Sequence, residues 1–274
     1  MKYWKSLSAM IAHIAKVLPE WEEMFLSYKD LKKQLKLIFP KEGESSCRPT
    51  KRPRLEDGGD QPEVAKEVTD FVTLLRREIH KLNSFFMDQE EDYVIKLELL
   101  KKTVEKANGS YVKLMNIGSE IVDLHGQMVL LENYSALNYL GIVKILKKYD
   151  KRSGDLLRLP FIQTVLEEPF FNTDVLKQLV KDCEILLRNN LKTTMTESEE
   201  RQQPLRVPQE LSEIDIMGNT YMALANSALQ VLEQIRSVSS TKSMYSLPPL
   251  QGNNLDEFWK NHSVTGTCLA KFWF

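Results

Sequence analysis

The chain has 274 residues, of which 42% are hydrophobic and 27% are charged. Its 37 Lys and Arg residues almost balance its 38 Asp and Glu residues, so net charge favours neither nucleic acid nor an anionic membrane, and a basic site must be a local patch. The cysteines are few and far apart, and the sequence contains neither a signal peptide pattern nor a run of roughly 20 apolar residues. We therefore expect a soluble intracellular protein without a transmembrane segment.

The N-terminal part predicts a helical hairpin. Apolar residues recur at helical spacing in a short helix expected from about residue 2 to 16. Pro19 ends this helix and suits the first position of a second one, expected to run to about Phe39. On the second helix, Tyr28 lies in an apolar stripe, and Lys32 falls within the angular span of that stripe. Such a lysine must extend out of the packed face or meet an anion at its edge.

A disordered linker is predicted at about residues 41–61, where Gly, Ser, Pro and charged residues predominate. It contains the basic run Lys51-Arg52-Pro53-Arg54. Runs of this kind can be nuclear-import signals, while many are only solvated linker charge. We expect the protein in the nucleus, with a cytoplasmic pool left open.

Two long antiparallel helices are expected to form the centre of a bundle. Helical periodicity covers about residues 64–102 and 114–150, and Ser153-Gly154 should end the second helix. The predicted fold class is all-α: an N-terminal hairpin packed on this bundle, followed by shorter helices at about 161–167 and 173–189. A polar stretch at 192–208 then separates these helices from a final helix at about 210–237, which could dock on the bundle or bind a partner. A flexible tail follows it.

One face of the second long helix is strongly basic near its end. Five cations fall within an arc of about 140°, opposite an apolar side; they are Lys144, Lys147, Lys148, Lys151 and Arg152. Like charges three or four residues apart repel by a few tenths of a kcal/mol per pair, so a polyanionic partner would turn a cost into a gain. The alternative is a solvated face without a specific ligand.

Catalytic chemistry is not indicated. The histidines are scattered, and the sequence contains no zinc-ligand spacing, glycine-rich phosphate loop or nucleophile motif. We therefore predict no enzyme activity, no metal and no cofactor. If the hairpin folds across the end of the bundle, Tyr28 and Lys32 would meet the basic face and Lys2, and their ammonium and hydroxyl groups would suit phosphate oxygens. The basic face lacks the interleaved aromatic residues that single-stranded nucleic acid requires.

Several segments closely resemble the SPX domain. They are Leu18-Pro-Glu-Trp, Phe25-Leu-Ser-Tyr-Lys-Asp-Leu-Lys-Lys33, Glu132-Asn-Tyr-Ser-Ala-Leu-Asn-Tyr, and Lys144-Ile-Leu-Lys-Lys-Tyr-Asp-Lys-Arg152. The resemblance covers about residues 1–191 as an SPX domain and leaves 192–274 as a C-terminal extension. Two segments of that extension are similar to those of plant stand-alone SPX proteins: Ile235-Arg-Ser-Val-Ser-Ser-Thr and Tyr245-Ser-Leu-Pro-Pro-Leu-Gln.

The resemblance implies a sensor of phosphate status that binds inositol hexakisphosphate and inositol pyrophosphates. The family's phosphate-binding cluster would correspond to Tyr28, Lys32 and Lys148, and a lysine surface beside it to Lys144, Lys147 and Lys151, with Lys2 contributing from the N-terminus. The implied partner of the liganded protein is a MYB coiled-coil phosphate-starvation transcription factor, which it would keep off DNA without binding nucleic acid or membrane itself. The competing hypothesis is a helical scaffold whose basic face binds acidic protein segments or headgroups without selectivity.

The N-terminal helix departs from the family pattern. Between Leu7 and Leu18 the chain is about three residues longer than usual, which is roughly one helical turn. An inserted turn could rotate or shift Lys2 relative to the basic face, whereas the assignments on the two later helices do not depend on it.

Overall fold

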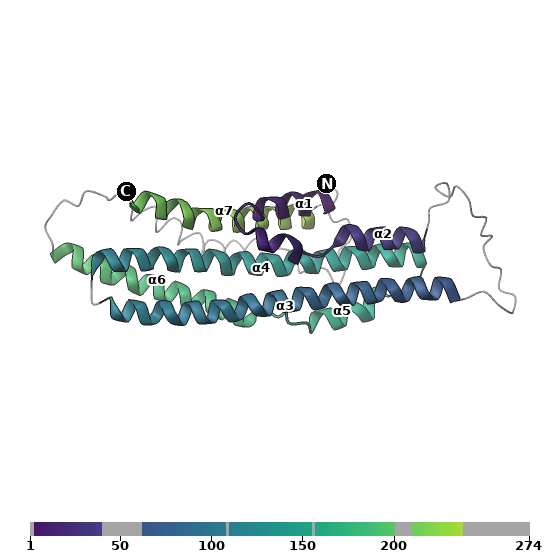
Figure 1. The fold of residues 1–274 in the computed structure, drawn as a ribbon, viewed down its shortest axis with the longest axis horizontal. Helices are drawn as coiled ribbons and strands as arrows, with labels where there is room; N and C mark the ends of the chain where they lie inside the picture. Colours follow the sequence, from purple (N-terminus) through teal and green to yellow (C-terminus); the bar gives the residue numbers. More distant parts are fainter. Residues whose placement is uncertain (1–2, 40–61, 108–109, 155–156, 201–209, 238–274) are drawn as a thin grey trace.

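A computed structural model shows the chain as an elongated bundle of α-helices (Figure 1). The structure describes residues 3–39, 62–107, 110–154, 157–200 and 210–237. In chain order, the helices are α1 (Tyr3–Ile14), the 3-10 helix η1 (Pro19–Met24), α2 (Tyr28–Ile38), α3 (Pro62–Lys106), α4 (Tyr111–Ser153), α5 (Arg158–Leu166), α6 (Asp174–Glu200) and α7 (Glu210–Ser237). Within the described ranges no residue forms a β-strand, and the all-α fold class is confirmed.

The two longest helices, α3 and α4, run side by side in opposite directions, as predicted (Figure 1). Helix α4 stops where the Ser153-Gly154 pair indicated. Gly154 has a φ of 80°, a left-handed conformation that glycine adopts without steric cost, and its N–H bonds to the carbonyl oxygen of Asp150. The Asp150 carboxylate in turn accepts the N–H groups of Leu157 and Arg158 at 3.1 and 3.2 Å, which fixes the start of α5.

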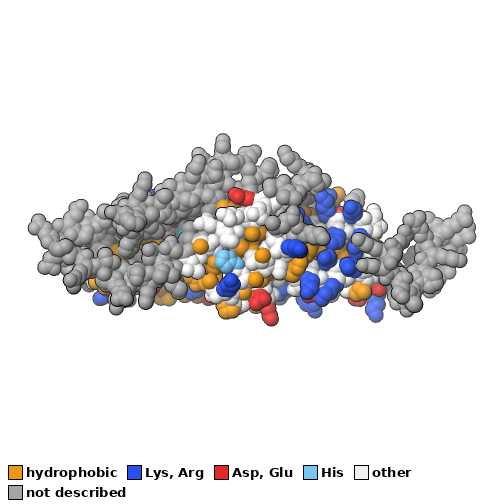
Figure 2. All heavy atoms as spheres, turned by 90° about the horizontal axis from the view of Figure 1, so that it is seen from above, with side chains coloured by type: hydrophobic (Ala, Val, Ile, Leu, Met, Phe, Trp, Pro, Cys, Tyr) orange, Lys and Arg blue, Asp and Glu red, His pale blue; other side chains and the backbone are white. Residues whose placement is uncertain are grey.

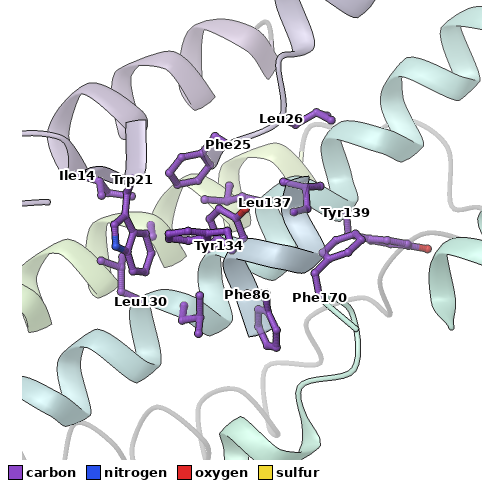
Figure 3. Packing of buried hydrophobic residues seen from close by; sticks show 14 of the residues in the cluster. Ile14, Trp21, Phe25, Leu26, Phe86, Leu130, Tyr134, Leu137, Tyr139 and Phe170 are labelled. Atoms are coloured by element: carbon purple, nitrogen blue, oxygen red, sulfur yellow. The ribbon is translucent and has the colours of Figure 1, made fainter. Parts of the chain in front are cut away.

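The middle of α4 is buried on nearly every side. Residues 128–131 are 0% exposed, and Tyr134 lies in an aromatic cluster at the centre of the molecule (Figure 3). The ring centroid of Tyr134 is 5.8 Å from that of Trp21, 4.9 Å from that of Phe25 and 5.1 Å from that of Phe85. Because these rings come from η1, α3, α4 and the segment after η1, the cluster fastens the N-terminal hairpin to the bundle.

The hairpin contains a break that we did not predict. The expectation of one helix from Pro19 to about Phe39 was wrong, since the 3-10 helix η1 ends at Met24 and α2 begins only at Tyr28. We call the intervening residues 25–27 the clamped turn. Its backbone groups, which would otherwise continue a helix, bond to side chains of α3 and α4.

Four side chains hold the clamped turn and the residue before it in place. Asn138 accepts the N–H of Leu26 at 2.8 Å and Glu78 accepts the N–H of Ser27 at 2.8 Å. The other two side chains are donors. The Tyr134 hydroxyl donates to the Met24 carbonyl and the Lys81 ammonium donates to the Phe25 carbonyl, both at 2.8 Å. Since Asn138 is 0% exposed and Glu78 is 7% exposed, this backbone satisfies its polar groups away from water.

Helix α6 is longer than predicted. The polar stretch from about residue 192 was expected to end it, but the helix continues to Glu200. A polar composition removes the core-facing pattern without removing helix propensity, which is high for the Lys, Met and Glu residues of this segment.

Helix α7 has the predicted bounds and lies along α4 beside α1 (Figure 1). Leu224, Ala225, Ala228, Leu232 and Ile235 are buried in the same core as α1 and α4. The final helix is therefore part of the packed bundle. The proposed domain boundary at residue 191 stays a prediction.

Three parts of the sequence analysis lie outside the described residues: Lys2, the linker with Lys51–Arg54, and the tail after Ser237. Of the helices in the described part of the chain, none is long and apolar enough to cross a bilayer. The same part holds no group of three or more His, Cys, Asp or Glu side chains placed to bind a metal ion.

Candidate anion-binding site

Tyr28, the first residue of α2, is enclosed by two aromatic rings of α1. The ring of Tyr3 meets it edge-on with centroids 5.0 Å apart, and the ring of Trp4 stacks on it at 6.2 Å with an interplanar angle of 10°. Tyr28 is 7% exposed, and this burial raises the pKa of its hydroxyl. The hydroxyl therefore stays protonated at neutral pH and can donate a hydrogen bond to an anion.

Lys144 of α4 also contacts Tyr3. Its ammonium nitrogen is 5.7 Å from the centroid of the Tyr3 ring, within the range of a cation–π contact. The Tyr3 hydroxyl donates to the carbonyl oxygen of Leu137 at 2.9 Å, which anchors the ring on α4. Burial and then the charge of Lys147 lower the pKa of Lys144. An anion bound beside Lys144 would stabilise its charged form and offset these two effects.

Gly141 allows α1 and the clamped turn to approach α4 one turn before Lys144. A Cβ atom at Gly141 would lie 2.6 Å from the Cδ2 atom of Leu26 and 2.7 Å from the hydroxyl oxygen of Tyr3. Both distances are shorter than non-bonded atoms tolerate, and the Tyr3 oxygen is held by its hydrogen bond to Leu137. The absence of a side chain at Gly141 is thus a condition for the arrangement of Tyr3, Tyr28 and Lys144.

At its other end, α2 is tied to α4 by Arg152. The guanidinium donates to the carbonyl oxygens of Leu35, in the last turn of α2, at 2.9 Å and of Phe39, which caps the helix, at 3.5 Å. A cation at this position also complements the negative end of the helix dipole. Arg152, which the sequence places on the basic face, therefore serves to hold α2.

These contacts at both ends mean that α2 and the end of α4 run side by side in the same direction, as Figure 1 shows. Lys32 lies one turn beyond Tyr28, and Lys148 lies one turn beyond Lys144, so both fall between the two fixed ends. Both are half-buried. Lys147 and Lys151 are exposed on the outer side of α4. Figure 2 shows basic side chains gathered at this end of the described surface.

The structure therefore brings most of the predicted site residues to one place. It joins Tyr28 to Lys144 through Tyr3, and it puts Lys32 and Lys148 on neighbouring helices between two fixed ends. From here on, we use the name basic face for six residues of this region, which leave out Arg152 because it holds α2: Tyr28, Lys32, Lys144, Lys147, Lys148 and Lys151. Lys2 lies outside the described residues.

Sequence reasoning missed the residues that build the basic face without belonging to it. Tyr3 lies four residues before Leu7 and continues the apolar stripe of α1, so it resembles an ordinary core residue, although the aromatic pair Tyr3-Trp4 next to Lys2 could have been noted. Glu78 and Lys81 resemble any exposed ion pair three residues apart on a helix. Asn138 carried a usable signal, because a polar side chain inside a continuous apolar run requires a buried partner.

The comparisons with known proteins agree on one family. The model of the SPX domain matches residues 113–165. The chain is 50% identical to SPX domain-containing protein 2 of Arabidopsis thaliana over 281 residues, covering 95% of this chain and 96% of the relative. It is 48% identical to SPX domain-containing protein 1 of Oryza sativa subsp. japonica over 282 residues, covering 94% of each.

A solved structure shares the fold. It is the SPX domain of Chaetomium thermophilum glycerophosphodiester phosphodiesterase 1 in complex with inositol hexakisphosphate, which aligns with a TM-score of 0.53 and 21% identity over 69% of this chain and 99% of that one. This shared fold agrees with the family of the Arabidopsis and Oryza relatives, which match almost the whole chain at much higher sequence identity. The chain belongs to the family of SPX domain-containing proteins.

Proposed function

We propose that the protein is a receptor for inositol hexakisphosphate and inositol pyrophosphates, and that it reports cellular phosphate status. The observation that carries this proposal is the convergence of α1, α2 and the end of α4 on one basic face, where a protonated tyrosine and a half-buried lysine both contact Tyr3. The related fold solved with inositol hexakisphosphate supports the same ligand class.

The composition of the basic face suits a compact ligand with several phosphates. Lys32 and Lys148 are half-buried on neighbouring helices and would contact the inner phosphates, together with the Tyr28 hydroxyl. Lys147 and Lys151 are exposed and would hold the outer phosphates. Ammonium groups on flexible stems adapt to phosphates arranged around a ring better than rigid guanidinium groups do. The proposal assigns no catalytic step to the chain.

Titration calorimetry of the full chain tests the ligand class. Inositol hexakisphosphate should bind at least about tenfold more tightly than inositol hexakissulfate, because the two share the ring geometry and each sulfate ester carries less negative charge than a phosphate ester. It should also bind more tightly than a linear polyphosphate of comparable charge. Equal, weak and strongly salt-dependent binding of all three would instead identify a non-selective basic scaffold.

The finer part of the proposal is that the liganded protein sequesters a MYB coiled-coil phosphate-starvation transcription factor and so represses phosphate-starvation genes. Linkage supplies the mechanism: a ligand that binds the partner-competent form more tightly also strengthens partner binding by the same factor. Capture of the coiled-coil segment by the immobilised chain should increase when inositol hexakisphosphate or a pyrophosphate is added. Capture that is unchanged by ligand would contradict this mechanism.

A nuclear location belongs to the same proposal. The run Lys51-Arg52-Pro53-Arg54 would act as the import signal. Replacing its three basic residues with alanine in a fluorescent fusion should move the protein towards the cytoplasm. An unchanged nuclear fraction would show that import does not depend on this run.

A further inference from the structure

Tyr3 contacts two residues of the basic face, although it is not itself assigned to contact the ligand. The ammonium of Lys144 lies over its ring, 5.7 Å from the centroid, and its ring forms an edge-to-face contact with the ring of Tyr28, with centroids 5.0 Å apart. Its hydroxyl is already used, since it donates to the carbonyl oxygen of Leu137 at 2.9 Å. Tyr3 thus contacts two candidate ligand-binding side chains, while its own hydroxyl is bonded to the backbone of α4.

The setting of Tyr3 makes it a rigid support. It is 9% exposed, and burial followed by the neighbouring Tyr28 raises the pKa of its hydroxyl, so the ring stays neutral. Its oxygen approaches the position that a Cβ atom of Gly141 would take, at 2.7 Å. The ring can therefore retain this position only while residue 141 lacks a side chain.

Lys144 is the side chain that gains from such a support. A lysine on a helix surface moves among many rotamers, and ordering it on binding a ligand costs conformational entropy. The electron-rich face of an aromatic ring attracts an ammonium group and limits that freedom before the ligand arrives. The half-buried position of Lys144 strengthens this attraction, because less water competes for the charge.

We propose that Tyr3 is a positioning residue for the ligand: its ring holds the Lys144 ammonium, and through the edge contact the Tyr28 ring, in the arrangement that binds phosphate. This inference rests on the proposed function for its consequence in ligand binding. The contact between the ring and the ammonium can be tested without any ligand.

The first test is a double-mutant cycle measured by titration calorimetry with inositol hexakisphosphate on the full chain. Tyr3→Leu should weaken binding by about 3- to 10-fold, which is the usual strength of a partly desolvated cation–π contact. Tyr3→Phe keeps the ring and loses only the hydroxyl, so it should restore affinity to within about twofold of the wild type. In a Lys144→Ala background, Tyr3→Leu should have little further effect, because its partner is gone.

An undiminished effect of Tyr3→Leu in the Lys144→Ala background would overturn the proposal, since Tyr3 would then act independently of Lys144. A loss of affinity in Tyr3→Phe as large as in Tyr3→Leu would overturn it as well, by assigning the effect to the hydroxyl. Urea unfolding of each variant separates these results from loss of the fold.

The second test uses NMR of the ligand-free chain labelled at the lysine ε-carbons, with Lys144→Arg to assign the signal. A methylene group above a ring face resonates upfield, so the Lys144 ε signal should be shifted in the wild type and in Tyr3→Phe, and unshifted in Tyr3→Leu. A signal that Tyr3→Leu does not move would refute the contact itself. If the contact is present but the wild type does not bind inositol hexakisphosphate, the proposed function has failed and the positioning role fails with it.

Discussion

Two regions of α4 show how one helix serves both stability and binding. Its middle, from residue 128 to 140, is covered by neighbouring helices and contains the side chains of the central core. Its last turns, from Lys144 to Arg152, are covered on one side by α2 and leave Lys147 and Lys151 exposed on the other. The buried middle fixes the position of the charged end, so substitutions in the two regions should change different properties.

The largest effect on stability is expected in the core. Trp21 is 1% exposed and packs edge-on against Phe85 and Tyr134, so Trp21→Ala should lower the free energy of unfolding by about 3–5 kcal/mol. Urea unfolding followed by circular dichroism measures this. Trp4→Ala is the matched control and should cost less, because Trp4 is half-buried. Equal losses in both variants would contradict the division between core and basic face.

The next effect concerns the clamped turn. Glu78→Leu removes the acceptor of the Ser27 N–H and the carboxylate paired with the Lys81 ammonium, both at 2.8 Å. It leaves the Ser27 N–H without an acceptor in a partly buried place, and the ammonium keeps its bonds to the Phe25 carbonyl and the Ser27 hydroxyl. The expected loss is about 2–3 kcal/mol of unfolding free energy. Glu98→Leu is the control, since Glu98 forms the same kind of pair with Lys101 but is 53% exposed. Exposed pairs contribute about 0–1 kcal/mol.

On the basic face, stability should hardly change. Lys151→Ala removes repulsion from Lys147 and Lys148, but it also removes a cation from the last turn of α4, where the helix dipole favours one. These effects oppose each other, so the unfolding free energy should stay within about 0.5 kcal/mol of the wild type. A loss of about 2 kcal/mol in urea unfolding would mean that Lys151 belongs to the structural framework.

The smallest effect is a dependence on pH. Burial lowers the pKa of Lys144, so between that pKa and the ordinary lysine value of about 10.5 the unfolded chain binds more protons than the folded one, and stability rises with pH. Relative to Lys144→Met, the wild type should therefore gain stability as the pH rises through the range below about 10.5. Urea unfolding of both proteins across this range measures the gain, and a constant difference would contradict it.

Periodicity predicted the helices of the bundle because their buried faces repeat along the chain, and it placed Tyr28, Lys32 and Lys148 on two helices that do meet. It could not predict the clamped turn, whose conformation depends on hydrogen bonds to side chains more than 50 residues away, such as Glu78. Periodicity put Arg152 at the edge of the basic arc, and the resemblance left it out of the site, but for the same reason neither could predict its bond to α2. Local sequence patterns therefore predict the faces of helices well and polar contacts between distant residues poorly.

The binding of inositol hexakisphosphate to Lys148→Ala and Lys113→Ala, compared by titration calorimetry, tests the central claim most directly. Both residues lie on α4, about 50 Å apart along the helix, and both variants lose one positive charge. Lys113 is exposed at the opposite end of α4 from the basic face. The account predicts roughly 10- to 100-fold weaker binding for Lys148→Ala and wild-type affinity for Lys113→Ala. Equal affinities in the two variants would contradict it.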